Sequence, residues 1–590
     1  MKAHLQSLLR DAAIAAFGDG AAPATIVIDA TKDAKHGDFA SNLALAMAKP
    51  LGKPPRAVAE ALVKSLPASK QVAKVEIAGP GFINFFLAKD AFQSVVADVL
   101  AAGAKYGTID PKPDQRVMVE FVSANPTGPM HVGHGRNAAY GDTLANLLAA
   151  TGWTVWREYY INDAGRQVDV LAISVWLRYL EGLGEAIKFP ARGYPGNYLL
   201  ATAQKLDAQY GRKFLYAAAQ VFNGLAAEPA SDEHATDAQK DEIKAGQEAH
   251  LDALIARIRN ILGPDYETVL RFAIADQLAA IRNTLDGFGV RFDNWYSERD
   301  LVESGAAEKA RQQLRASGHT YEKDGALWYR TTERGDDKDR VLVRANGTPT
   351  YFGNDLAYHV DKMNRGWPRL IDVWGADHHG LLVRMNAAIE SLTGSKDALH
   401  VTLIQFVTLS SGRMGKRSGN FVTLADLIAE AGKDATRFFY LMRSHDQHLE
   451  FDVDLARERS TENPVFYVQY AHARIRSVFA QLAERGGTWD AAAATKALHR
   501  LDNEHEKALL AAIARYPEVL RNSAANYAPH TLAFYLKNEL ADALHSYYNA
   551  HKFLGEDAEL QSARLALIEA TRIVLANGLG ILGVSAPNEM

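Results

Sequence analysis

The stretch between residues 117 and 160 constrains the fold of this chain most, because its apolar pattern changes from strand to helix and back to strand. Residues 117–122 form an apolar, β-branched run, and turn-forming residues occupy 125–129. Apolar residues then recur at helical spacing: Tyr140, Leu144, Leu147 and Leu148. A second strand-like run covers 154–160. This order predicts half of a nucleotide-binding βαβ fold, and therefore an α/β protein.

Two histidines stand where that helix is expected to begin. At a spacing of three residues, His131 and His134 emerge on the same side of the first helical turn, where free backbone N–H groups and the positive dipole end favour anions. Gly133 lets a nucleotide approach the backbone closely because it has no Cβ. The turn therefore predicts a phosphate site, and a pair of capping histidines at an ordinary helix start is the alternative.

Composition excludes several classes of protein. The chain has 590 residues, 48% of them hydrophobic, which indicates a folded protein of several domains. It has no cysteine, so disulfides, thiolate nucleophiles and cysteine-ligated zinc sites are excluded. A net charge of -5 argues against a strongly basic nucleic-acid scaffold but leaves room for a local basic groove. We recognise no signal peptide or membrane span and expect a cytoplasmic protein.

The pattern divides the chain into three expected domains. A small α/β unit covers 1–112 and ends at a proline-containing linker, Asp110-Pro-Lys-Pro-Asp114. A nucleotide-binding domain covers 113–455 and is interrupted, at about 170–280, by a polar helical insertion. Helical periodicity dominates from 456 to 590.

A second chemical segment is Leu409-Ser-Ser-Gly-Arg-Met-Gly-Lys-Arg-Ser-Gly-Asn420. It places Arg413, Lys416 and Arg417 within one short loop. Such a group of cations can neutralise a triphosphate while charge builds on the leaving pyrophosphate. A solvated basic loop is the alternative, but the presence of the histidine turn in the same fold favours phosphate binding.

Together the two segments resemble the HIGH and KMSKS signatures of class I aminoacyl-tRNA synthetases, and their flanks resemble arginyl-tRNA synthetases specifically. The matching stretches are Phe121-Val-Ser-Ala-Asn-Pro-Thr-Gly-Pro129, Tyr159-Tyr-Ile-Asn-Asp-Ala-Gly165, Thr350-Tyr-Phe-Gly-Asn-Asp355, Asp372-Val-Trp-Gly-Ala-Asp-His-His-Gly380 and Asn463-Pro-Val-Phe-Tyr-Val-Gln-Tyr-Ala-His-Ala-Arg474. The resemblance spans nearly the whole chain. It implies a class I Rossmann-type catalytic domain, a small N-terminal α/β domain and an all-helical C-terminal domain.

The second signature departs from the pattern of the family. Where family members carry Lys-Met-Ser-Lys-Ser, this chain has Arg413-Met-Gly-Lys-Arg417, so only Met414 and Lys416 match. The resemblance gives Lys416 a catalytic role and leaves the roles of Arg413 and Gly415 open.

The resemblance also implies a reaction in two steps. Arginine and ATP give arginyl-adenylate and pyrophosphate, and the terminal ribose hydroxyl of tRNA(Arg) then attacks the activated carbonyl and releases AMP. Such catalysis rests on orientation and on stabilising charge at the α-phosphate. The matching catalytic residues are His131, His134 and Lys416, and Gly133 and Met414 join them at the ATP site. We expect Mg²⁺ with the ATP, no protein-bound metal, and arginine activation that requires tRNA.

Arginine sets its own chemical requirement. A guanidinium is planar, always charged and carries five donors, so its pocket needs carboxylates and neutral acceptors. The residues that match the amino-acid pocket of the family are Glu120, Asn125, Tyr351 and Asp355. Asp355 would face the guanidinium, and Asn125 would hold the α-amino or carboxyl end. As alternatives, Glu120 pairs with a lysine and Tyr351 belongs to the core.

The sequence predicts surfaces on which tRNA bases can stack, but it does not identify contacts that would distinguish one base from another. Aromatic and basic residues of the C-terminal helices can stack on unpaired anticodon bases, and the candidates are Tyr467, Tyr470 and Arg474. By resemblance the first domain meets the elbow of the tRNA, with Phe39, Asn42 and Asn84 as candidates. We expect a monomer.

Two other functions fit parts of the pattern. A small-molecule nucleotidyltransferase shares the His-x-Gly-His turn but is usually far shorter and lacks a large helical C-terminal domain. A non-catalytic RNA-binding relative would not need both histidines and Lys416. Two further motifs predict no site: Gly578-Leu-Gly-Ile-Leu-Gly583 leaves no room for a βαβ unit and predicts helix-end packing, and Asp377-His-His379 lacks further ligands at metal spacing.

Overall fold

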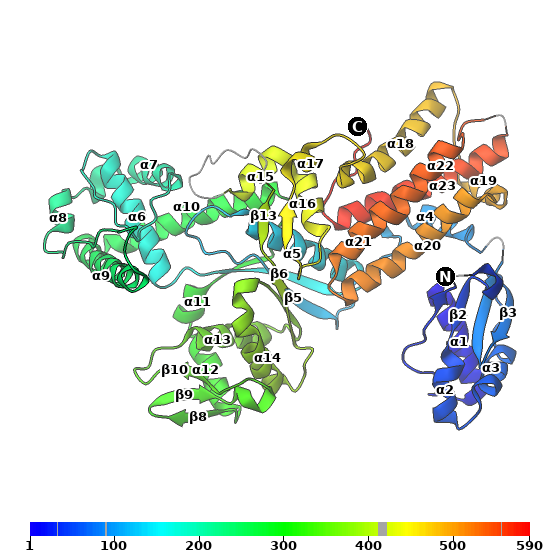
Figure 1. The fold of residues 1–590 in the computed structure, drawn as a ribbon, viewed down its shortest axis with the longest axis horizontal. Coiled ribbons are helices and arrows are strands. Elements are labelled where there is room, and N and C mark those ends of the chain that lie inside the picture. Colours follow the sequence, from blue (N-terminus) through cyan, green and yellow to red (C-terminus); the bar gives the residue numbers. More distant parts are fainter. Residues whose placement is uncertain (32, 89–90, 411–421, 556) are drawn as a thin grey trace.

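The computed structural model describes residues 1–31, 33–88, 91–410, 422–555 and 557–590. The molecule is elongated, with a parallel sheet near its middle (Figure 1). A helical insertion extends from one side of the sheet, and a C-terminal helical bundle packs on the other side (Figure 1). The N-terminal domain lies beneath that bundle, at the end of the molecule opposite to the insertion (Figure 1).

The N-terminal domain packs helices against an antiparallel sheet of strand order β1-β2-β4-β3. Its elements are α1 (Lys2–Phe17), β1 (Asp29–Ala30), β2 (Phe39–Ser41), α2 (Leu43–Leu51), α3 (Pro55–Lys64), β3 (Val72–Ala78) and β4 (Phe82–Leu87). Leu9, Leu62 and Phe85 are fully buried in its core. An ion pair of 3.0 Å between Lys2 and Glu518 joins this domain to the C-terminal helices.

The central sheet is parallel, with strand order β12-β11-β5-β6-β7. Its strands are β5 (Arg116–Glu120), β6 (Thr154–Ile161), β7 (Asn294–Ser297), β11 (Leu370–Gly375) and β12 (Leu399–Ile404), and the helices beside them are α5 (Val132–Ala150), α13 (Tyr351–Asn364) and α14 (His379–Thr393). From β5 the chain runs through α5 to β6, and from β11 it runs through α14 to β12 on the opposite side. The order therefore reverses between β5 and β11, which is where α/β sheets bind ligands.

Helices separate β6 from β7 and form the insertion: α6 (Arg166–Gly182), α7 (Tyr198–Tyr210), α8 (Ala218–Phe222), α9 (Asp237–Leu262) and α10 (Asp265–Gly287). They enclose their own core around the fully buried Trp176. A smaller subdomain follows β7, with α11 (Glu298–Glu303), α12 (Ala306–Ala316), β8 (Thr320–Lys323), β9 (Ala326–Tyr329) and β10 (Arg340–Val343). Its antiparallel strands pair in the order β10-β9-β8.

The C-terminal bundle consists of α18 (Pro464–Glu484), α19 (Ala491–Lys496), α20 (Glu504–Ala525), α21 (Pro529–Tyr535), α22 (Asp542–Ala550) and α23 (Ala558–Ile581), with α4 (Ser94–Ala102) packed against it. Between the sheet and the bundle lie β13 (Val407–Leu409), α15 (Leu424–Ala431), α16 (Lys433–Leu441), β14 (Leu449–Phe451) and α17 (Val453–Arg457). The predicted α/β fold with an all-helical C-terminal domain is confirmed. Gly578 packs within α23 against Leu536, as helix-end packing predicts.

A buried arginine ties the bundle to the sheet domain. Arg437 on α16 is inaccessible to solvent and donates from Nε to the Leu582 carbonyl at 2.9 Å and from Nη2 to Asp142 of α5 at 2.5 Å. Gly583 has φ +70°, and a Cβ there would stand 2.4 Å from the Arg437 guanidinium. The end of the chain is therefore built into the junction, and the junction requires a glycine.

Candidate active site

The carboxyl ends of β5 and β11 bring the predicted site residues together at the switch point. Beyond β5, Val122 and Ser123 have positive φ angles of 69° and 40°, a strained conformation for residues with side chains. Asn137 of α5 holds this bend, because its side chain accepts from the Val122 N–H at 2.7 Å and donates to the Val373 carbonyl of β11 at 2.9 Å. The bend turns Ser123 back so that its hydroxyl donates to Glu120 at 2.9 Å.

His131 and His134 cap the start of α5 through one nitrogen of each ring. His131 Nδ1 accepts from the backbone N–H groups of Gly133 at 3.1 Å and His134 at 3.3 Å, and His134 Nδ1 accepts from the His131 N–H at 3.3 Å. The rings stack with centroids 3.6 Å apart. Burial lowers the pKa of His131 and lowers that of His134 to about 3, so both rings are neutral near pH 7.

This arrangement decides the tautomer of both rings. A neutral imidazole whose Nδ1 accepts carries its proton on Nε2. In the part of the chain that the structure describes, no residue accepts from either Nε2. The histidines therefore cap the helix, as the alternative stated, and also keep two N–H donors for a phosphate. A Cβ on Gly133 would lie 3.0 Å from the His131 ring, so a larger residue would push that ring.

Residues just after the second predicted segment lie against the histidine turn. Thr423 forms a β-bridge with His131, and the Leu424 N–H donates to the Met130 carbonyl at 2.8 Å. Met414 and Lys416 themselves, like the other residues of 411–421, lie outside the described residues. The turn and the C-terminal flank of the loop are thus neighbours in the fold.

A row of acidic residues crosses the sheet and meets cations of α13 and of the residue that follows it. Asp372, Glu120 and Glu158 are neighbours in register on β11, β5 and β6. Their partners are His359 at 2.7 Å from Asp372, Lys362 at 2.5 Å from Glu120 and 2.9 Å from Asp372, and Arg365 at 2.6 Å from Glu158. We call these six residues the ionic ladder. It fixes α13 over the sheet, and it shows that Glu120 does pair with a lysine.

Asp355 stands near the start of the same helix and outside the ladder. Its closest cation is His359, whose Nδ1 lies 3.8 Å from Oδ1. Burial raises the pKa of Asp355, and the charge of Asp372 adds to the effect. Burial likewise raises the pKa of Glu120, although Lys362 opposes it.

A further carboxylate, Glu298 at the start of α11, joins this group. It accepts a hydrogen bond from the Tyr160 hydroxyl. Burial and the charges of Asp163 and Asp355 raise the pKa of Glu298. Glu120, Asp355 and Glu298 form what we call the carboxylate cluster. The charge of Asp355 acts against that of Glu298 in a desolvated place, and a bound cation would stabilise the charged forms of both.

Tyr351 and Asn125 lie at the edge of this cluster. Tyr351 is the first residue of α13 and its side chain is 65% exposed, so the alternative that it belongs to the core is wrong. The charges of Asp355, Glu120 and Glu298 all act on its hydroxyl. Asn125 is exposed and donates to Gln167 at 2.7 Å. Both residues remain accessible to a ligand that enters from solvent.

The sequence prediction missed Lys362, His359 and Glu298. A signal for the first two existed, because positions 355, 359 and 362 share one face of a helix. Glu298 had no such signal, since its approach to Asp355 depends on how α11 and α13 pack.

The predicted RNA-binding residues lie in two separate places. In the N-terminal domain, Asn42 is exposed and Phe39 is half-buried, but Asn84 is 5% exposed on β4, which leaves little of it for RNA. In the bundle, Arg474 lies between Tyr470 and Tyr548, at 4.8 Å and 4.3 Å from their ring centroids.

Tyr467 stands beside that stack. Its ring contacts His545 at 4.4 Å between centroids, and its hydroxyl donates to Asp542 at 2.7 Å. Tyr467, Tyr470 and Arg474 therefore form one half-buried aromatic and cationic cluster on α18.

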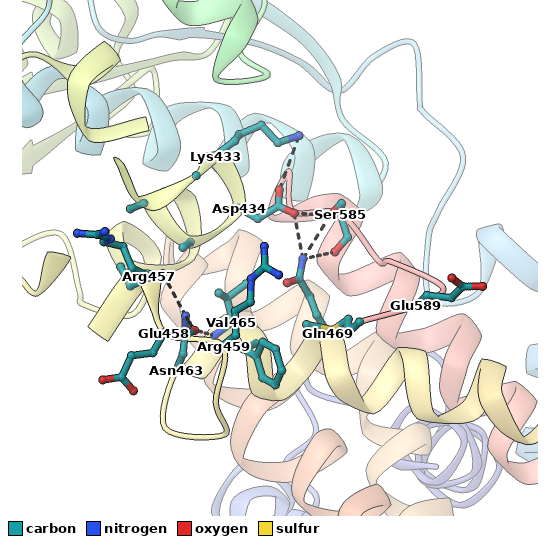
Figure 2. A pocket seen from close by; sticks show the side chains of 16 residues that line it. Lys433, Asp434, Arg457, Glu458, Arg459, Asn463, Val465, Gln469, Ser585 and Glu589 are labelled. Atoms are coloured by element: carbon teal, nitrogen blue, oxygen red, sulfur yellow. Dashed lines mark hydrogen bonds and ion pairs between the residues drawn. The ribbon is translucent and has the colours of Figure 1, made fainter. Parts of the chain in front are cut away.

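A hollow of about 600 Å³ lies elsewhere, where α16, α17 and α18 meet the last residues of the chain (Figure 2). Gln469 donates to Asp434 and to the Ser585 carbonyl, both at 2.9 Å, along its wall. Its charged side chains balance: Lys433, Arg457 and Arg459 against Asp434, Glu458 and Glu589. The hollow thus shows no preference for a charged ligand.

Two absences hold for the described ranges. No group of three or more histidine, aspartate or glutamate side chains there could hold a metal ion. No helix there is both long and apolar enough to cross a membrane.

Family models match all three parts of the chain. The "Arginyl tRNA synthetase N terminal domain" matches residues 3–87, the "tRNA synthetases class I (R), catalytic domain" matches 95–183, and the "DALR anticodon binding domain" matches 468–590.

Curated relatives are similar over their whole length. The "Arginine--tRNA ligase" of Legionella pneumophila (strain Paris) is 49% identical, and that of Thioalkalivibrio sulfidiphilus is 50% identical, each over 600 residues that cover 100% of both chains. In three dimensions the chain is similar to the arginyl-tRNA synthetase of Thermus thermophilus, with a TM-score of 0.74, 24% identity, and coverage of 99% of this chain and 100% of that one. Because the two sequences are only 24% identical, this structural similarity is evidence for the fold alone.

Proposed function

The chain belongs to the arginyl-tRNA synthetase family, and we propose how its residues carry out the reaction of that family. The protein joins arginine to tRNA at the expense of ATP. One observation carries the assignment of its site: the carboxylate cluster lies at the same switch point as two neutral histidine donors at a helix start. A cationic amino acid and a phosphate can therefore be held side by side.

We assign arginine to the carboxylate cluster. Asp355 and Glu298 face the guanidinium, because no described residue supplies either of them with a cation within hydrogen-bonding distance. Glu120 supports them from the end of β5. Tyr351 closes the exposed side, and Asn125 holds the α-amino or carboxyl end. Charged and bidentate hydrogen bonds of this type are the strongest that a guanidinium makes.

We assign ATP to the start of α5. His131 and His134 donate from Nε2 to phosphate oxygens, and Gly133 leaves the backbone open to the nucleotide. Lys416 and Met414 complete this subsite; its support is that Thr423, close after them in sequence, is bridged to His131. Mg²⁺ enters with the ATP.

The chemistry needs no protein nucleophile. The carboxylate of arginine attacks the α-phosphorus, the bond to the pyrophosphate breaks, and pyrophosphate leaves with the electron pair. A ribose hydroxyl of tRNA then attacks the carbonyl carbon of the adenylate, the bond from that carbon to the phosphate oxygen breaks, and AMP leaves with the electron pair while the hydroxyl proton passes to the leaving phosphate or to solvent. The protein contributes orientation and positive or N–H groups where negative charge develops.

The C-terminal and N-terminal domains bind the tRNA. Tyr467, Tyr470 and Arg474 offer stacking and cation contacts to anticodon bases, and Phe39 and Asn42 offer contacts to the tRNA elbow. The domains extend over 1–112, 113–455 and 456–590. We further propose that the protein acts as a monomer in the cytoplasm, where tRNA and ATP are available.

The test is exchange of labelled pyrophosphate into ATP with different amino acids. Arginine should support exchange, and only when tRNA is present. Citrulline, which replaces the guanidinium by a neutral urea of the same shape, should be rejected by about 10⁴-fold, because buried carboxylates would lose their partner. Exchange that citrulline supports as well as arginine would contradict the assignment of the carboxylate cluster.

A further inference from the structure

We propose that Lys362 is a positioning residue for the arginine substrate. Lys362 acts by holding the carboxylate of Glu120 in place and compensating its charge. The proposal rests on the function assigned above, in which Glu120 belongs to the arginine subsite. Lys362 cannot touch a substrate itself, because its side chain is 0% exposed.

Three described groups surround the Lys362 ammonium. Nζ donates to Glu120 Oε2 at 2.5 Å and to Asp372 Oδ1 at 2.9 Å, and it lies 4.5 Å from the centre of the Tyr358 ring. Glu120 is held at both ends, because Oε1 accepts from Ser123. Lys362 and Ser123 of the strained turn therefore hold the Glu120 carboxylate in one orientation, each through one of its two oxygens.

The same contact sets the charge of the arginine subsite. Within the ionic ladder, the described acids and cations match: Asp372, Glu120 and Glu158 against His359, Lys362 and Arg365. Asp355 and Glu298 therefore remain as the carboxylates for the guanidinium. Without Lys362, Glu120 would be a buried carboxylate beside Asp372, and no described cation would be in direct contact with it. It would take up a proton or turn toward the substrate, and either change misplaces a partner of arginine.

Three variants test this role in the full-length protein: Lys362→Met, Glu120→Gln and the double substitution. Met keeps the length and removes the charge. Kinetics of tRNA-dependent pyrophosphate exchange give the KM for arginine and for ATP separately. We expect Lys362→Met to raise the KM for arginine by about 100-fold, the cost of a misplaced contact, and to leave the KM for ATP nearly unchanged. Lys309→Met, on the exposed surface of α12, is the matched control and should behave as wild type.

The double variant decides whether Lys362 acts through Glu120. In the Glu120→Gln background, Lys362→Met should add less than about threefold to the KM for arginine, because the group that it positions is already altered. This comparison remains possible if Lys362→Met alone fails to fold, since the double variant leaves no unpaired charge on Glu120.

The outcomes separate the two proposals. If the effects of the two substitutions multiply, or if both KM values rise together, the positioning role is wrong. If Glu120→Gln leaves the KM for arginine unchanged, the assignment of Glu120 to the arginine subsite is wrong, whatever Lys362 does.

Discussion

Replacing Asp355 by asparagine removes one negative charge and almost no volume. Two unit charges about 4 Å apart attract by about 4 kcal/mol at an effective dielectric constant of about 20. The Asp355 side chain is 22% exposed, so solvent screens it little. Asparagine keeps one acceptor, and a neutral hydrogen bond contributes about 1 kcal/mol. The net loss of about 3 kcal/mol corresponds to an increase of about 100-fold in the KM for arginine.

The assay is steady-state pyrophosphate exchange with saturating tRNA, in which arginine and ATP are varied in turn. The KM for ATP should stay within about twofold of wild type, because the histidine turn is untouched. Asp361→Asn is the control on the same helix, since Asp361 already accepts from Arg365 at 2.9 Å and from Tyr296 at 2.8 Å. An Asp355→Asn enzyme whose KM for arginine rises less than about threefold would refute the reasoning.

Three further results are expected. The His134 ring should show no NMR titration between about pH 5 and 8, because burial lowers its pKa to about 3. The free energy of unfolding should fall as the pH drops below about 6.5, because only the unfolded chain takes up this proton there. A titration midpoint of the His134 ring near pH 6.5 would contradict this prediction. Gly583→Ala should lower the free energy of unfolding by about 1–3 kcal/mol. Gly580→Ala should not lower it, because no atom lies within 4 Å of a new Cβ there. Equal effects of the two substitutions would contradict the requirement for a glycine at the junction. Arg474→Met should raise the KM for tRNA by about 10-fold and leave that for ATP alone, with Arg476→Met, exposed on the same helix, as the comparison.

Local patterns predicted the histidine turn well, for a physical reason. The change of period around 117–160 and the small residue at Gly133 are properties of neighbouring residues, so one sequence displays them. The functional and capping interpretations of His131 and His134 were alternatives in the sequence. The structure allows both, because each ring caps with Nδ1 and no described residue accepts from its Nε2.

Contacts between segments that are distant along the chain could not be predicted from the sequence. Lys362 and Glu120 are 242 residues apart, and their pairing depends on the register of β5 against β11 and on the position of α13. Strands buried on both faces do not alternate in polarity, so their register leaves no trace in the pattern. The ladder could therefore be seen only once the strands and α13 were placed together.

The most direct test of the carboxylate cluster is the number of protons released when arginine binds. Burial raises the pKa values of Glu120, Asp355 and Glu298, so each of these carboxyls keeps its proton to a higher pH in the free protein than an ordinary aspartate or glutamate does. A bound guanidinium stabilises the charged forms, and protons must leave. Titration calorimetry at about pH 6, in buffers of different ionisation enthalpy and with tRNA present, should show proton release on arginine binding that grows as the pH falls. Binding without proton exchange, or with proton uptake, would contradict recognition by the carboxylate cluster.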